Sequence, residues 1–545
     1  MGKADFGVLY GQKTTEDALL IYSSYEDAKA SPQTGDFIVL TPKDEGNTKY
    51  LARVEAEIYD EDPIFKSQDK TLIAVHYARI AERELSERDK QKMFSYTYKV
   101  RILGTFTDSG STIAFTTAVR KLPIVSYIAR HLNKREIEAI LNKTNENGVE
   151  IGYLCVGETV FKDKGPILFE INKLRNRRTM VFAQSGFGKT NLVKGLLYHM
   201  TRDTSYGKLI FDLNGEYFLR GTTTYGLGDI NDDRIRSNVV VYTDKKLPED
   251  YAKQSRFIFG GKVALNMHKH LAVSDILNFG GGFSEVMNAF LRYLDEDGVS
   301  NFIENIDEYV REPQKLHKEF PDFFDAKKEA SARTTVAAIR KRIRYLIDEG
   351  HLHSSLSNLV EDVFKYLREG KTIVIDLSLK DNMEASIIST ILVRKLFENN
   401  KEKFTSDQPG EVISSVIFVE EAQNVLSQEF VKSNANPFVR VAKEGRKFGL
   451  GLVAVTQRPS AISDEIRTQA ENFFAFHMGN SDDIKALVKS NINYDGVISN
   501  FIQRETIKGN LYMVSSDQAF ALPVRVTEFE KLVEGKVYLE AKFKD

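Results

Sequence analysis

A chain of 545 residues is too long for a single hydrophobic core, so we expect two to four domains. Its 75 basic and 77 acidic residues nearly cancel, which excludes a basic surface over the whole molecule and confines any nucleic-acid contact to a local stripe or pore. One cysteine excludes an internal disulfide, and no apolar run has the length of a bilayer span or a secretory signal. We therefore expect a cytoplasmic protein with no membrane partner.

The N-terminal part, residues 1–165, consists of short alternating segments separated by turn residues. This pattern predicts a small β-barrel domain without catalytic spacing, suited to assembly or partner contact. Strands are expected at 6–10, 36–40, 49–58, 96–107 and 113–117, a helix-compatible excursion at 71–92, a helical run at 126–141, and a strand pair at 152–160 and 166–169.

From residue 178 onward, strands alternate with helices, which predicts an α/β fold with a parallel sheet. Its strands are expected at 179–183, 208–213, 239–242, 372–376, 416–419, 451–456 and 473–477. About 120 residues between the third and fourth strands read as helices at 272–277, 284–295, 301–310, 332–348 and 357–367. The predicted division is therefore a β-barrel domain at 1–165, an ATPase core at 166–245 and 371–545, and an inserted helical subdomain at 246–370.

A phosphate-binding loop is predicted directly after the strand 179–183. Two glycines can present a concave row of backbone N–H groups, and the following helix adds its dipole. Lys189 suits the β- and γ-phosphates of ATP, and the Thr190 hydroxyl suits Mg²⁺. The predicted nucleotide-binding residues of the loop are Ser185, Gly186, Phe187, Gly188, Lys189, Thr190 and Asn191. Ala183 stands where the usual pattern has its first glycine, a change that we expect the loop to tolerate.

Polar groups follow several of the predicted strands. Glu420 and Glu421 end an apolar strand, and ATP hydrolysis needs one carboxylate near Mg²⁺ and another to activate water. We assign Glu420 to the metal shell, together with Thr190, and Glu421 to the water. Gln457 ends the next strand, where an amide can read the γ-phosphate. A solvated acidic turn is the alternative explanation for the two glutamates.

Several arginines are candidates for contacts beyond the chain's own site. Arg446 suits a finger that reaches a neighbouring subunit's nucleotide, because its planar fork donates several hydrogen bonds to phosphoryl oxygens. A basic surface turn is the alternative. Arg178 is a further candidate for a neighbour's nucleotide. On the helix 332–348, Arg340 and Arg344 lie within one arc, either as a solvated basic face or as a face toward DNA.

The ordered motifs closely resemble those of the HerA family of hexameric DNA-translocating ATPases, relatives of the FtsK motors. They are Gly186-Phe187-Gly188-Lys189-Thr190, Asp212-Leu213-Asn214-Gly215-Glu216-Tyr217, Val419-Glu420-Glu421-Ala422-Gln423-Asn424, Glu444-Gly445-Arg446-Lys447-Phe448-Gly449 and Thr456-Gln457-Arg458-Pro459-Ser460. The N-terminal domain resembles the family's HAS barrel, and 519–526 its closing strand. The resemblance implies a RecA-like P-loop NTPase core. Gln423 departs from the family, where histidine is commoner.

The resemblance further implies a homohexamer with ATP and Mg²⁺ between subunits and double-stranded DNA in a central channel. Glu421 then activates water, Gln457 senses the γ-phosphate, Arg446 completes the neighbour's site, and Asp212 occupies the family's acidic position on the second strand. Implied partners are a nuclease such as NurA or, in bacterial defence loci, an effector such as a sirtuin-like NAD-degrading protein. The alternative function is a nucleotide-gated scaffold that assembles and regulates such an effector in antiviral defence with little translocation of its own.

Overall fold

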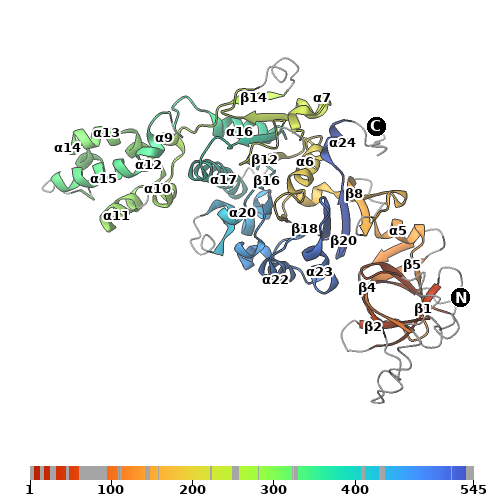
Figure 1. Cartoon of the computed structure of the whole chain (residues 1–545). Coiled ribbons are helices and arrows are strands. Elements are labelled where there is room, and N and C mark those ends of the chain that lie inside the picture. The colour runs from red at the N-terminus through yellow and green to blue at the C-terminus, as the bar shows by residue number, and fades with distance from the viewer. Residues whose placement is uncertain are drawn as a thin grey trace, which may run out of the picture. The chain divides into compact units, whose positions relative to one another are not determined.

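The computed structural model divides the chain into two compact units (Figure 1). Unit 1 comprises Met1–Glu170, Ala183–Gly188 and Asn472–Thr527, and unit 2 comprises Ile171–Phe182, Lys189–Glu471 and Glu528–Asp545. The structure describes residues 5–534 except 13–17, 25–31, 44–47, 60–94, 109, 111–112, 142–147, 157–158, 221–223, 248–256, 280–281, 322, 325–328, 351, 407–410, 429–435 and 517. The excursion expected at 71–92 lies outside the described residues.

The N-terminal part of unit 1 is an antiparallel sheet whose strands close on themselves. The sheet order is β2-β1-β7-β3-β4-β5-β6, and β2 also pairs with β5, so six strands form a closed ring, as a barrel requires. The strands are β1 (Asp5–Gln12), β2 (Ala18–Ser24), β3 (Phe37–Thr41), β4 (Thr48–Tyr59), β5 (Ser95–Asp108), β6 (Ile113–Thr116) and β7 (Ile128–His131).

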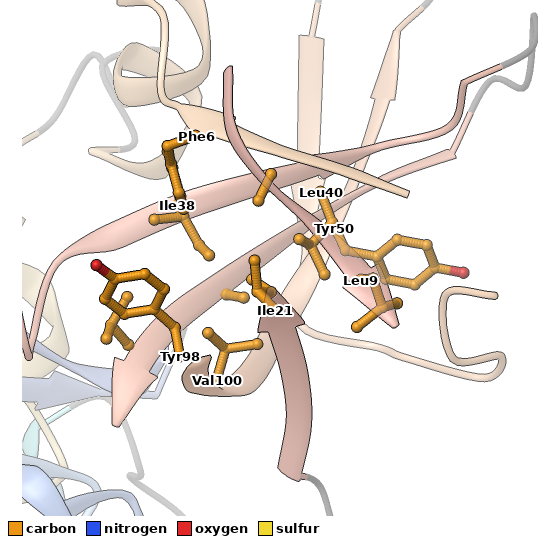
Figure 2. Close-up of a cluster of buried hydrophobic side chains, with 11 residues drawn as sticks. Phe6, Leu9, Ile21, Ile38, Leu40, Tyr50, Tyr98 and Val100 are labelled. Atoms are coloured by element: carbon orange, nitrogen blue, oxygen red, sulfur yellow. The ribbon is translucent and has the colours of Figure 1, made fainter. Parts of the chain in front are cut away.

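A hydrophobic core fills this ring because alternate side chains of each strand point inward. Phe6, Ile38, Tyr98 and Val100 come from three different strands and are each at most 1% exposed. Figure 2 shows their side chains with those of neighbouring strands between the ribbons. Burying a side chain of this size contributes roughly 1.5–3 kcal/mol relative to exposure. The pairing of β2 with β5 closes the sheet, and the inward-facing side chains form its core.

The prediction of a helix at 126–141 is wrong over its first half. Residues 128–131 form β7, which pairs antiparallel with both β1 and β3 and so completes the ring. The helix α5 (Lys134–Ile140) begins only after Asn133, which forms a capping box with Glu136. β2 was also not predicted. β7 depends on partners distant in the chain, which local sequence patterns do not reveal, whereas β2 pairs with the adjacent β1 as well as with the distant β5.

The rest of unit 1 is a second antiparallel arrangement. Its strands pair in the order β10-β8-β20-β19-β18, with β9 beside β8. They are β8 (Gly148–Val156), β9 (Thr159–Val160), β10 (Pro166–Glu170), β18 (Asn472–Ala475), β19 (Asn510–Ser515) and β20 (Gln518–Val526), accompanied by α22 (Ser481–Ser490) and α23 (Val497–Arg504). The expected strand at 519–526 is confirmed, whereas β19 was missed.

Unit 2 contains the predicted parallel sheet. Its strands pair in parallel in the order β11-β17-β16-β12-β15-β13-β14. They are β11 (Arg178–Phe182), β12 (Gly207–Asp212), β13 (Val239–Tyr242), β14 (Ile258–Gly261), β15 (Thr372–Asp376), β16 (Ser415–Val419) and β17 (Leu450–Thr456). Strands buried on both faces read as continuous apolar runs, which is why all but β14 were predicted within a residue or so.

Helices surround this sheet and fill the insertion. α16 packs against β12 and β15, and α17 packs against α20. The helices beside the sheet are α6 (Lys189–Met200), α7 (Asp233–Arg236), α16 (Leu359–Arg368), α17 (Asn382–Thr405), α18 (Gln423–Leu426), α20 (Pro437–Glu444), α21 (Asp464–Arg467) and α24 (Phe529–Val533). Within the described ranges, none of the helices combines the length and the hydropathy needed to cross a bilayer.

The insertion, drawn in green in Figure 1, is helical as predicted. Its helices are α9 (Met267–His270), α10 (Val273–Phe279), α11 (Glu285–Tyr293), α12 (Glu296–Glu304), α13 (Ile306–Arg311), α14 (Pro313–Glu319) and α15 (Glu329–Ile347). The helix expected at 301–310 is in fact divided at Asn305, whose side-chain amide donates to the carbonyl of Asn301 at 3.0 Å. Such a local side-chain bond competes with the helical backbone pattern.

Lys208 predicts a pH dependence of stability. Its side chain is fully buried at the start of β12, and burial lowers its pKa to about 7, whereas an unfolded lysine titrates near ~10.4. Between these values the unfolded chain binds more protons, so stability rises with pH across this window. We expect Lys208→Met to flatten this rise by on the order of 1 kcal/mol per pH unit, measured by denaturant unfolding at several pH values.

The matched control for this measurement is Lys262→Met, which removes an exposed lysine of the same unit. It should leave the slope of unfolding free energy against pH unchanged. Equal slopes for Lys208→Met and the unmodified chain would contradict the assignment of this pH dependence to Lys208.

Candidate nucleotide-binding site

The glycine turn after β11 has the backbone conformation expected of a phosphate-binding loop. Gly186 has φ +81° and Gly188 has φ +109°, a region that residues with a Cβ rarely adopt. A Cβ on Gly186 would meet nothing within 4 Å, so its conformation rather than crowding favours glycine there. Ser185 is exposed, and Phe187 packs its ring 4.4 Å from that of His477. Ala183, the departure from the motif, is completely buried at the strand's end.

The helix α6 begins at Lys189 and carries the charged end of the loop. Burial lowers the pKa of Lys189, and the nearby carboxylates of Glu421, Glu420 and Glu216 oppose that shift. The Thr190 hydroxyl donates to Glu216 Oε2 at 3.0 Å. The Asn191 side chain accepts a hydrogen bond from the backbone N–H of Phe529 at 2.7 Å, so it ties α6 to the start of α24.

Asp212 ends β12 and organises the turn that follows it. Its carboxylate accepts three backbone hydrogen bonds, from Gly215 at 2.7 Å, Glu216 at 3.1 Å and Tyr217 at 2.9 Å. Burial raises its pKa to about 6 despite these donors. The residue expected to bind nucleotide therefore holds the turn that carries Glu216 and Tyr217.

Glu420 follows β16 and is 9% exposed. Its carboxylate accepts a hydrogen bond from the Tyr217 hydroxyl at 2.7 Å and a longer one from the Asn214 amide at 3.4 Å. Burial raises its pKa to about 8, and the neighbouring Asp212 adds to the rise. Tyr217 was not singled out from the sequence, although it lies in the motif that carries Asp212.

Glu421 is held between two glutamines. Its carboxylate accepts from Gln457 Nε2 at 2.7 Å and from Gln423 Nε2 at 2.6 Å. The Gln423 carbonyl oxygen in turn accepts from the Thr456 hydroxyl at 2.5 Å. Glu421 also has φ +44°, which is uncommon for a residue with a side chain and clusters at functional sites. Gln457 was predicted from its place at a strand end, whereas Gln423 stood out in the sequence only as a departure from the family.

The predicted arginines lie away from this cluster. Arg446 is exposed in the short 3-10 helix Gly445–Phe448. Arg178 starts β11, at the end of the strand opposite the loop, where it pairs with Glu471 at 3.3 Å and donates to the Ala442 carbonyl at 3.0 Å. On α15, Arg340 pairs with both Asp307 and Asp348. Those ion pairs support a structural role for Arg340 rather than a face toward DNA.

The donor set of this site fits Mg²⁺. Glu420 and Glu216 are carboxylates beside the Thr190 hydroxyl, and Mg²⁺ prefers oxygen ligands while retaining water and substrate phosphates. A divalent cation would also offset the like charges of Asp212, Glu216 and Glu421 that raise the pKa of Glu420. No group of three or more histidine, cysteine or acidic side chains forms a metal cage among the described residues, so the ion would need the nucleotide as a ligand.

A parallel α/β sheet, a glycine turn leading into Lys189-Thr190, and acids at neighbouring strand ends together define a P-loop ATPase. Residues 149–396 match the family "Helicase HerA, central domain", and residues 345–483 match the family "Zonular occludens toxin (Zot)". By the first match and the relatives below, the chain is similar to HerA-family ATPases.

Three relatives from archaea cover most of the chain. A probable helicase of Methanocaldococcus jannaschii is 21% identical over 82% of this chain and 77% of its own length. The DNA double-strand break repair helicase HerA of Sulfurisphaera tokodaii is 23% identical over 76% of this chain and 75% of its own, and that of Pyrococcus furiosus is 25% identical over 71% and 70%.

The contact between Gln423 and Glu421 predicts a catalytic effect. Removing one hydrogen bond to a charged group costs about 1.5 kcal/mol, or roughly tenfold in rate if Glu421 loses its orientation. We expect Gln423→Ala to lower kcat of ATP hydrolysis by about that factor with nucleotide Kd unchanged, because Gln423 touches Glu421 and not the loop.

The matched control is Gln503→Ala, which truncates an exposed glutamine on α23 and should leave kcat unchanged. Gln423→His keeps a donor at this position and should retain more activity than Gln423→Ala. A Gln423→Ala protein with unaltered kcat would contradict a role in orienting Glu421.

Proposed function

We propose that this chain is an ATP-driven double-stranded DNA translocase of the HerA type that works as a hexameric ring with a partner protein. The observation that carries the proposal is the Glu421 carboxylate, held by Gln423 and Gln457 beside Lys189 in a chain similar to HerA-family ATPases. Three relatives are named helicases, two of them in DNA double-strand break repair, which supports DNA as the polymer that is moved.

In this proposal each residue of the site has a stated task. Residues 185–191 form the phosphate-binding loop, in which Lys189 binds the β- and γ-phosphates of ATP. Thr190 and Glu420 hold Mg²⁺, which neutralises phosphate charge when it is bound. Glu421 orients the attacking water and accepts its proton, and its two glutamine donors fix the carboxylate plane toward that water.

The Gln457 contact gives the chain a means of reporting the γ-phosphate. Its amide nitrogen donates a hydrogen bond to the Glu421 carboxylate at 2.7 Å. A γ-phosphate would compete for the same amide, because an anionic phosphate oxygen is an equally strong acceptor. If the Gln457 amide exchanged the Glu421 carboxylate for the γ-phosphate, the end of β17 would respond to whether ATP or ADP is bound.

The first test of this mechanism uses the two charged residues of the site. Lys189→Ala should lose nucleotide affinity because the phosphates lose their cation, whereas Glu421→Gln should bind ATP normally and lose at least ~10²-fold in kcat because the water loses its base. Binding is measured with a fluorescent ATP analogue and turnover by phosphate release. Glu411→Gln, an exposed glutamate paired with Lys403, serves as the control. Undiminished turnover by Glu421→Gln would disprove the assignment.

A second test concerns Arg446, which is exposed in the short 3-10 helix before β17. If Arg446 acts on the nucleotide of the next subunit, Arg446→Ala and Glu421→Ala chains are each inactive, but a mixed ring contains interfaces that pair an intact Arg446 with an intact Glu421. We expect mixing to restore measurable ATPase activity. Arg292→Ala, another exposed arginine of unit 2, is the control and should be active alone. Mixed rings without activity would rule out action across the subunit boundary.

A third test separates the translocase from the alternative of a nucleotide-gated scaffold that regulates an effector. DNA should stimulate a translocase's ATPase activity, and this stimulation should fall steeply with salt, because phosphate contacts release counterions. ATPase activity that is indifferent to DNA, with effector binding unaffected by turnover, would favour the scaffold. We also propose that residues 1–165 act as a HAS-barrel-like domain and that residues 246–370 are an inserted subdomain. The proposed partner is a nuclease or an NAD-degrading protein.

A further inference from the structure

Unit 1 contains a cleft that the nucleotide site does not use. It has a volume of about 370 Å³, within the range of small-molecule sites, and it lies where the β3–β4 part of the closed sheet meets α23, β19 and β20. Gly35 fits against α23 so closely that a Cβ there would come 2.5 Å from the Phe501 ring. The closed sheet is therefore packed tightly onto α23 at the edge of the cleft.

A buried arginine lines this cleft with an unused donor. Arg53 is 1% exposed, and its Nε and Nη2 donate to Glu55 Oε1 at 3.0 and 2.8 Å. Its Nη1 has no hydrogen-bond partner among the residues that the structure describes. A buried donor left unpaired costs about 1–3 kcal/mol, so an oxygen acceptor that reached this nitrogen would remove that cost.

The other walls indicate what kind of molecule would supply that acceptor. Phe37, Phe501 and Tyr512 provide aromatic surface, with the last two rings stacked at 6.4 Å, and Arg504 provides a second cation. Glu505 also lines the cleft, but its carboxylate already accepts from the N–H groups of Thr506 and Ile507 and from the Asn510 amide. A ligand with a single negative charge suits this wall. Inorganic phosphate carries up to two negative charges, and the carboxylates of Glu505 and Glu55 would repel it more strongly.

The cleft is connected to the phosphate-binding loop through two backbone routes within unit 1. Residues 505–507 of its wall continue to Gly509, whose N–H donates to the carbonyl of Phe187 at 3.1 Å. At the end of α23, the Ile502 carbonyl lies 3.0 Å from the ring Nδ1 of His477. The His477 carbonyl then accepts from the N–H of Gln184, and its ring packs on Phe187.

We propose that this cleft binds a small organic carboxylate with a flat apolar body, and that its occupancy changes nucleotide binding at the loop. The carboxylate bonds Arg53 Nη1 and faces Arg504, and the apolar body lies against the aromatic wall. Binding orders residues 505–509 and thereby the Phe187 carbonyl. The binding step is independent of the proposed translocase function, and only its effect on the loop rests on the ATPase.

The test uses the chain's single cysteine as a reporter. Cys155 lines the cleft and is 2% exposed, so the rate at which a thiol reagent labels it in the folded full-length chain reports access to the cleft. The probes are benzoate, phenylacetate and N-acetyl-phenylalanine at millimolar concentration, with N-acetyl-phenylalaninamide and inorganic phosphate for comparison. At least one carboxylate should slow labelling severalfold, and the amide and phosphate should not.

Two variants make the result specific. Arg53→Lys keeps a positive charge beside Glu55 but lacks the second branch of the guanidinium, and Arg504→Met removes the exposed cation without disturbing the core. Both should abolish protection of Cys155, whereas the exposed control Arg120→Lys should retain it. If Arg53→Lys fails to fold, Arg504→Met alone decides. Labelling that no carboxylate slows, protection by the amide equal to that by the acid, or protection by phosphate would overturn the proposal.

The effect on the loop is measured separately. The carboxylate that protects Cys155 should change the nucleotide Kd by about fivefold, the lower end of common coupling between sites. The Glu421→Gln chain, which cannot hydrolyse ATP, should show the same protection and the same change in Kd. Protection of Cys155 without any change in Kd would refute the coupling while leaving the binding site intact. Loss of ATPase function alone would leave both results unaffected.

Discussion

The convergence of carboxylates at one edge of a parallel sheet is the constraint on which the ATPase site depends. Parallel strands bring their carboxyl ends together, so Asp212, Glu420 and Glu421 are neighbours although more than two hundred residues separate the first from the others. Their mutual repulsion and burial raise the pKa of Glu420 to about 8. Lys189 lies beside them as a counter-charge, and a bound cation would supply more. Repulsion among these carboxylates therefore favours the binding of a divalent cation such as Mg²⁺.

Hydrogen bonds divide the two adjacent glutamates into different environments. Glu420 is buried against the Tyr217 hydroxyl, which Asp212 positions through three backbone N–H groups. Glu421 turns the other way, with a positive φ, and meets two amides. Consecutive residues of the same chemistry thus lie in separate environments, which suits the different roles that we propose for them at the metal and at the water. Gln423, the departure from the family's commoner histidine, donates a hydrogen bond to Glu421.

Unit 1 adds a possible means of control that the motifs do not suggest. Its cleft contains an arginine that folding leaves with an unpaired donor, and its walls reach the carbonyl of Phe187 and the N–H of Gln184. A loop that binds phosphate through its backbone is sensitive to the peptide orientation of its neighbours. Hydrogen bonds from the segments beside the cleft thus hold the unit 1 part of the loop, at Gln184 and Phe187.

The sequence by itself determined the parallel strands, the glycine turn, the paired acids and Gln457, because buried strands and phosphate chemistry leave local signatures. It did not reveal β2, β7, β14 or β19, and the helix that it predicted at 126–141 extended over β7. Only the tertiary structure decided that Gln423 holds Glu421, that Asp212 builds a turn, and that Arg340 is paired with aspartates. Those roles arise from side chains that meet across the fold, and spacing along the chain does not encode such meetings.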